Sequence, residues 1–148
     1  MKTMDHTIDI PAHPTVVWRV LVATHQYSAW NPFIRQLDGE LRAGARLLVR
    51  ITAANRRMTF KPTVLDVEEG RLLRWRGRLG VPGVCDGVHE FRLEPLPGGG
   101  TRFVQSETFS GVLVPLLGRV LDDTAEGFRA MNEALQARAA AAAKTTPR

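Results

Sequence analysis

Two residues of this sequence combine the types and the placement that proton chemistry requires, His89 and Glu107. Each lies on a strand-like segment, and the two segments flank a glycine-rich turn at residues 96–100. If Pro95 pairs with Thr101 in an antiparallel hairpin, the side chains of His89 and Glu107 lie opposite each other on one face. Aromatic residues alternate onto the same face, so we expect an imidazole–carboxylate pair inside an aromatic-lined pocket.

Three roles are open to this pair. An imidazole oriented by a carboxylate in a partly dry pocket can move protons as a general acid and base. The pair can instead anchor a hydroxyl or carbonyl group of a ligand. It can also be purely structural, because a buried ionisable group is costly unless it is paired. We expect His89 and Glu107 to orient a bound ligand, and we expect binding rather than catalysis.

Large apolar side chains elsewhere in the chain could line the same pocket or simply fill the core, as most buried aromatic residues do. We expect about half of them to face the pocket. With His89 and Glu107, the candidate ligand-binding residues are Trp30, Phe33, Met58, Phe60, Trp75, Phe91, Phe103, Phe109, Phe128 and Met131.

Other reactive residue types lack the spacing of a site. Cys85 and His89, on one strand, would lie about 13 Å apart, too far for a nucleophile–base couple. We therefore expect Cys85 to be a buried, unreactive thiol. His6, His13 and His25 show no metal-ligand spacing, so we expect no metal and no cofactor.

Length and composition narrow the class of protein. The 148 residues suit one domain over residues 1–148, with a frayed tail from about residue 139 to residue 148. A single cysteine excludes an intramolecular disulfide and favours a reducing cytoplasm. We expect neither a secretory leader nor a membrane span, because the first residues lack an apolar core and no run approaches about 18 apolar residues. We expect a soluble, cytoplasmic protein.

The basic balance raises the question of nucleic-acid binding, because the net charge is +5 and the isoelectric point about 10.3. Arginines cluster at Arg71, Arg74, Arg76 and Arg78. The last three alternate along one strand, as on the solvent face of a half-buried sheet. Trp75 points to the opposite face, so no aromatic platform accompanies the positive charge. We expect no nucleic-acid partner.

The elements that must position these residues follow from periodicity. Residues 3–10 alternate as a strand, a helix begins at Pro14, and the segment 27–33 predicts a short second helix or tight corner. A long amphipathic helix begins near Val114 and Pro115. Between them, six strands are predicted at residues 34–41, 46–53, 57–67, 71–79, 84–95 and 101–110.

This order predicts an α+β fold. A curved, seven-stranded antiparallel sheet would wrap around the long C-terminal helix, with two short helices after the first strand. Such a sheet tends to leave a cavity between itself and the helix.

The ordered set of segments resembles the START-like, polyketide cyclase/dehydrase superfamily (SRPBCC), which has the helix-grip fold. The resemblance runs from about residue 8 to residue 135. Its carriers are residues 14–18 (PTVVW), 30–33 (WNPF), 64–67 (VLDV), 73–75 (LRW), 89–95 (HEFRLEP), 99–103 (GGTRF) and 107–111 (ETFSG).

The resemblance implies a deep cavity that takes apolar or aromatic small molecules, either lipid-like or polyketide-like. It leaves two alternatives open, because a fold does not determine a function. One is a cyclase or dehydratase that uses His89 and Glu107 as acid and base. The other is a co-chaperone-like interaction module. No segment could hold a Rieske cluster, and the sequence does not determine the oligomeric state.

Overall fold

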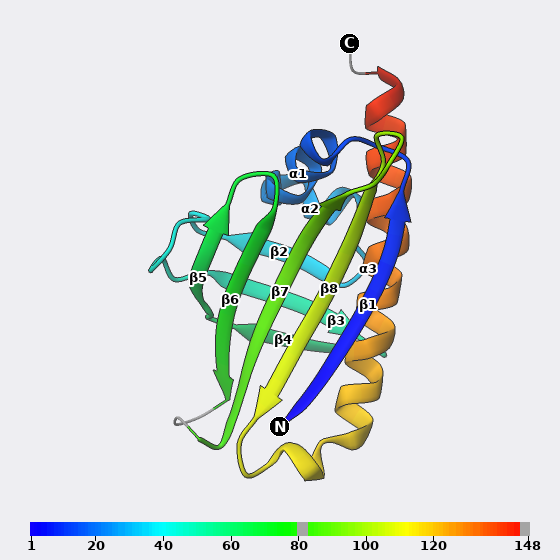
Figure 1. The fold of residues 1–148 in the computed structure, drawn as a ribbon. Helices are drawn as coiled ribbons and strands as arrows, with labels where there is room; N and C mark the ends of the chain where they lie inside the picture. The colour runs from blue at the N-terminus through cyan, green and yellow to red at the C-terminus, as the bar shows by residue number, and fades with distance from the viewer. Residues whose placement is uncertain (80–82, 146–148) are drawn as a thin grey trace.

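The computed structural model describes residues 1–79 and 83–145, in which curved antiparallel sheets lie along one long helix (Figure 1). The described helices are α1 (Pro14–Val22), α2 (Tyr27–Trp30) and α3 (Gly118–Thr145), with the 3-10 turns η1 (Thr24–Gln26) and η2 (Val114–Leu116). The described strands are β1 (Lys2–Ile10), β2 (Ile34–Asp38), β3 (Leu48–Ala53), β4 (Arg56–Phe60), β5 (Thr63–Glu68), β6 (Leu72–Leu79), β7 (Cys85–Pro95) and β8 (Thr101–Ser110).

The predicted α+β class and helix-grip architecture are confirmed, but the strand number differs. Eight strands form a five-stranded sheet of order β1-β8-β7-β6-β5 and a three-stranded sheet of order β2-β3-β4. The strand predicted over 57–67 is divided at Pro62, which has no N–H to donate to a ladder. The carbonyl of Pro62 instead accepts from the Leu47 N–H at 2.8 Å, so the chain turns from one sheet into the other.

The hairpin of β7 and β8 has the predicted register. Pro95 pairs with Thr101 and His89 pairs with Glu107, without a bulge. The turn is closed by a 2.8 Å hydrogen bond from the Leu96 N–H to the Gly100 carbonyl. On each strand alternate side chains are buried, among them His89 on β7 and Gln105 on β8, so this face of the hairpin points into the core.

The segment between β1 and β2 forms the two predicted short helices. α1 begins with Pro14 at its first position, and the His13 ring accepts a hydrogen bond from the Thr15 N–H. After α2, the Asn31 side-chain oxygen accepts from the N–H groups of Phe33 and Ile34, both at 2.9 Å. These bonds hold the corner that leads into β2 and turn Phe33 into the core.

The long helix α3 packs on β1 and α1 through a stripe of buried residues: Phe128, Met131, Leu135 and Ala139. Near its start, Leu121 packs with Cys85 and Val114 in a smaller cluster. Its α-helical part begins at Gly118, after η2, slightly later than predicted. We predicted a frayed tail from about residue 139. The helix instead continues to Thr145, because Ala139 is buried in the core and Ala143 packs against it. Residues 146–148 lie outside the described residues.

Gly127 explains how closely α3 approaches the rest of the core. A β-carbon at this position would lie 2.3 Å from the ring of Phe33, which is too close for any side chain. The ring of Phe33 in turn packs edge-on against Phe128, with centroids 5.4 Å apart. Within the described part of the chain, no helix is long and apolar enough to cross a membrane.

Candidate functional site

A cavity of about 270 Å³ lies between the two sheets and the N-terminal part of α3. Most of its wall is apolar and comes from elements far apart in the sequence. β2, β3 and β4 with Pro62 supply one side, β6, β7 and β8 another, and the segment 117–124 the third. The lining residues are Phe33, Ile34, Val49, Ile51, Met58, Phe60, Pro62, Trp75, Gly77, Arg78, Cys85, Gly87, His89, Glu107, Phe109, Leu117, Val120, Leu121 and Thr124.

The predicted pair of His89 and Glu107 lies in this wall. The Nδ1 atom of His89 is 3.4 Å from the Oε2 atom of Glu107, and their side chains are only 5% and 17% exposed. The imidazole stacks obliquely among aromatic rings, with its centroid 4.5 Å from that of Phe91 and 4.9 Å from that of Phe128. The site therefore places an imidazole and a carboxylate in a surrounding that is otherwise apolar.

The other nitrogen of His89 belongs to a buried chain of amide groups. Its Nε2 atom is 2.9 Å from the Oε1 atom of Gln105. The Nε2 atom of Gln105 donates to the Oδ1 atom of Asn132 on α3 at 2.7 Å. The Nδ2 atom of Asn132 donates in turn to the backbone carbonyl of His6 on β1 at 3.2 Å. His89 is thus tied through two amides to the helix and to the edge strand.

Sequence reasoning did not single out Gln105 and Asn132 as functional residues. The available signal was polarity at an inward position, because Gln105 alternates with Phe103 on the buried face of β8. Asn132 follows the apolar residue Met131 on the buried stripe of α3. Neither pattern predicts that Gln105 and Asn132 contact each other, since 27 residues separate them in the sequence.

Two glycines that pair across β6 and β7 line the cavity and leave space in it that larger side chains would fill. Gly77 and Gly87 face each other in the ladder. A β-carbon built on Gly77 has no atom within 4 Å, whereas one built on Gly87 would lie 2.7 Å from the Oε1 atom of Glu107. Gly77 therefore leaves open space, and Gly87 leaves the space that the Glu107 carboxylate occupies.

The predicted large apolar residues divide between cavity and core. Five of them line the cavity: Phe33, Met58, Phe60, Trp75 and Phe109. Four are fully buried in the core outside the cavity lining: Phe91, Phe103, Phe128 and Met131. Trp30 also lies outside the lining and packs edge-on against Tyr27, with ring centroids 5.3 Å apart. The aliphatic residues of the lining had no distinguishing sequence pattern.

Cys85 is buried and lines the cavity. Burial raises the pKa of its thiol, and the negative charges of Asp86 and Glu107 raise it further. A raised pKa keeps the sulfur protonated and weakly nucleophilic near neutral pH. Among the described residues, no group of three His, Cys, Asp or Glu side chains is placed to hold a metal ion.

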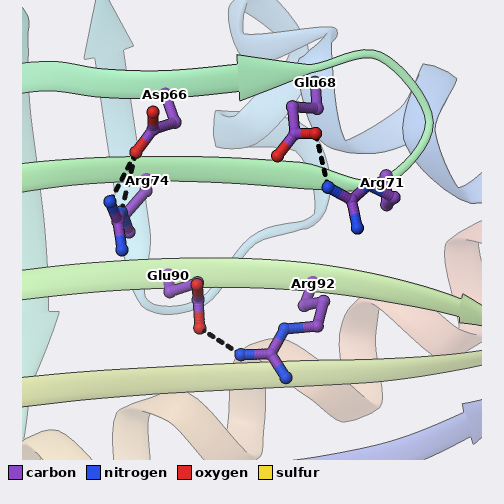
Figure 2. Close-up of polar contacts among 6 residues, drawn as sticks. All are labelled: Asp66, Glu68, Arg71, Arg74, Glu90 and Arg92. Atoms are coloured by element: carbon purple, nitrogen blue, oxygen red, sulfur yellow. Dashed lines mark hydrogen bonds and ion pairs between the residues drawn. The ribbon is translucent and has the colours of Figure 1, made fainter.

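Two arginines of the cluster, Arg71 and Arg74, lie with Arg92 on the outer face of the large sheet, each beside a carboxylate (Figure 2). Arg74 contacts Asp66 at 2.6 Å, Arg92 contacts Glu90 at 2.7 Å, and Arg71 pairs with Glu68. Two of the four clustered arginines, Arg71 and Arg74, are thus paired with carboxylates. A third, Arg78, lies 3.5 Å from Asp86 and also lines the cavity.

A curved antiparallel sheet that grips one long helix, with an apolar cavity between them, defines the helix-grip fold of START-like proteins. The family model described as polyketide cyclase/dehydrase and lipid transport matches residues 1–144. The chain belongs to this family, as the sequence resemblance predicted.

Solved structures with the same fold have little sequence in common with the chain. Zhui aromatase/cyclase from a Streptomyces strain has a TM-score of 0.76 at 18% identity, with 93% of each chain covered. A START superfamily protein from Mycobacterium smegmatis has a TM-score of 0.71 at 17% identity, covering 93% of this chain and 96% of that one. A point mutant of norcoclaurine synthase from Thalictrum flavum has a TM-score of 0.72 at 13% identity, with 93% of each chain covered.

At these identities the likeness shows the fold alone. No curated protein matches the sequence.

Proposed function

We propose that this protein binds an apolar or aromatic small molecule in the cavity between its sheets and α3. The observation that carries the proposal is an apolar cavity whose wall holds one imidazole–carboxylate pair, His89 and Glu107. Burial of apolar ligand surface supplies the affinity, at about 25 cal/mol per Å². The volume of about 270 Å³ lies just below the usual range of ligand pockets, which favours a compact ring system over a long acyl chain.

The polar pair sets the orientation of the ligand. The described contacts of the Glu107 carboxylate engage its Oε2 atom with His89, while its Oε1 atom lies over Gly87. A carboxylate oxygen accepts hydrogen bonds, so the preferred ligand is one that carries a donor such as a hydroxyl group. A ligand carboxylate at the same place would meet a like charge.

An enzyme of the cyclase or dehydratase type is the second candidate, and the same pair favours it. An imidazole beside a carboxylate in a mostly apolar cavity has the geometry of a general acid and base. Catalysis requires that His89→Gln abolish turnover while binding survives, whereas a carrier loses only affinity. A third candidate, an interaction module, would have a filled and vestigial pocket, and the cavity of about 270 Å³ disfavours it.

Native mass spectrometry of the purified protein, compared with the same sample after denaturation, tests for a retained ligand. We expect a mass excess that disappears on denaturation, or, for ligand-free protein, saturable binding of the fluorescent probe 2-naphthol. Gly77→Leu places a side chain in the open space of the cavity, so it should weaken naphthol binding at least about tenfold.

Arg76→Leu is the matched control, since it adds the same side chain one residue earlier on the exposed face of β6. It should bind naphthol like the unmodified protein. Equal binding by Gly77→Leu and the unmodified protein would place the probe elsewhere and contradict the proposal.

A further inference from the structure

We propose that Gln105 and Asn132 are positioning residues that keep a proton on the Nε2 atom of His89. The Nδ1 atom, which faces the Glu107 carboxylate at the cavity wall, is then the nitrogen that can carry a second, exchangeable proton. The inference deepens the proposed function, because it rests on the same site and states which nitrogen the site makes available.

The direction of the amide chain is set by a group that can only accept. The backbone carbonyl of His6 has no proton, so Asn132 must turn its Nδ2 atom toward it, at 3.2 Å. The Oδ1 atom of Asn132 then faces Gln105 and accepts from its Nε2 atom at 2.7 Å. That nitrogen also lies 3.5 Å from the carbonyl of Phe128, a second group that only accepts.

With its nitrogen committed to α3, Gln105 presents its Oε1 atom to His89 at 2.9 Å. An amide oxygen cannot donate, so the Nε2 atom of His89 must carry a proton for the contact to be a hydrogen bond. The alternative places two lone pairs against each other in a buried site, where Gln105 is fully buried and His89 only 4% exposed. Reversing the whole chain would place the Oδ1 atom of Asn132 against the His6 carbonyl, two acceptors with no hydrogen between them, and the lost hydrogen bond is costly in the interior.

The remaining nitrogen faces a different acceptor. Glu107 on β8 is the charged group that meets the ring, 3.4 Å from the Nδ1 atom, while β6 meets the ring with Trp75 and α3 meets it with Phe128. Since the Nε2 proton is held by Gln105, proton gain and loss occur at Nδ1. The Nδ1 atom of His89 and the Glu107 carboxylate are therefore the groups of the site that can donate a proton to a ligand or accept one from it.

The test is nitrogen-15 NMR of the histidine rings in the ligand-free protein, titrated between about pH 5 and pH 10, a range that covers ordinary imidazole ionisation. The His89 signals are assigned by their loss in His89→Gln. We expect the Nε2 signal to stay in its protonated, pyrrole-like position throughout, with any deprotonation at Nδ1. A pyridine-like Nε2 signal at any pH overturns the proposal.

Two variants test the chain itself. In Gln105→Met the acceptor for Nε2 is gone, so the Glu107 carboxylate should draw the single proton of the neutral ring to Nδ1. Asn132→Leu frees the Gln105 amide to rotate and should give a mixture of the two tautomers. Gln136→Leu is the matched control, because Gln136 also joins α3 to a β1 carbonyl, that of Asp9 at 2.8 Å, without touching the chain.

Unchanged tautomers of His89 in Gln105→Met and Asn132→Leu would overturn the positioning role. If either variant fails to fold, the titration of the unmodified protein decides the proposal. The measurement needs no ligand. A protonated Nε2 in a protein that binds no naphthol would refute the proposed function alone.

Discussion

At the scale of single residues, the site depends on a residue without a side chain. Gly87 lies opposite Gly77 on the inner face of the sheet, and the Oε1 atom of Glu107 occupies the space where a β-carbon on Gly87 would be. The carboxylate can approach the sheet, and with it His89, because that space is free. Glycine is therefore needed at this position because it lacks a β-carbon, and not because of its backbone conformation.

Gly87→Ala should displace the Glu107 carboxylate and break its pairing with His89, since the new β-carbon would lie 2.7 Å from Oε1. We expect 2-naphthol affinity to fall about tenfold, because the naphthol hydroxyl loses its hydrogen bond to the charged Glu107 carboxylate. Thermal stability should change little, because the displaced atom ends a flexible side chain. Fluorescence titration measures the affinity, and Gly77→Ala, whose β-carbon meets open space, is the control. Equal losses in both variants would contradict this role of Gly87.

At the scale of elements, Tyr27 joins the two short helices. Its hydroxyl donates to the carbonyl of Leu21 in the last turn of α1, while its own backbone begins α2. The ring is fully buried, and this burial raises the pKa of the Tyr27 phenol, because the interior disfavours phenolate. The corner therefore tolerates only the protonated form.

The raised pKa of Tyr27 predicts alkaline instability. The neutral phenol is favoured in the folded state, so its contribution is complete below the unfolded value of about 10 and is lost as the pH rises above it. Tyr27 is the chain's single tyrosine, so tyrosinate absorbance reports on it directly. We expect this absorbance to appear together with the loss of circular dichroism.

Tyr27→Phe should lose about 1 kcal/mol of stability at neutral pH through the missing hydrogen bond, and should show less alkaline destabilisation. Tyrosinate absorbance that rises near pH 10 while the circular dichroism stays intact would contradict the assignment.

At the scale of the whole molecule, the large sheet separates two chemistries. Its inner face carries aromatic residues, the cavity and His89, and its outer face carries arginine–carboxylate pairs (Figure 2). The outer pairs are partly accessible to water: the Arg71 and Glu68 side chains are 65% and 46% exposed, and those of Arg92 and Glu90 are 45% and 18% exposed. Water and salt screen such pairs, so they add little to stability. The absence of a nucleic-acid partner stays a prediction.

Arg92→Met should therefore lower the free energy of unfolding by less than about 1 kcal/mol, as measured by urea denaturation. Phe128→Ala, in the fully buried core, should cost about 3–5 kcal/mol in the same experiment. A loss of 2 kcal/mol or more in Arg92→Met would show that the outer pairs contribute substantially to the fold.

The sequence by itself determined the fold class and the register that pairs His89 with Glu107. Both are local properties, because side chains alternate with a period of two and a short glycine-rich turn sets which residues face each other. The division between β4 and β5 also has a local signal, because Pro62 cannot donate to a ladder, although we predicted a single strand over residues 57–67.

Only the tertiary structure decided which aromatic side chains face the cavity and which fill the core. It also decided that Asn132 on α3 meets Gln105 on β8, and that Gly87 makes room for Glu107. A cavity is the space between elements that lie far apart along the chain. Its shape depends on how α3 and the two sheets pack against one another, and no local pattern of residues encodes that packing.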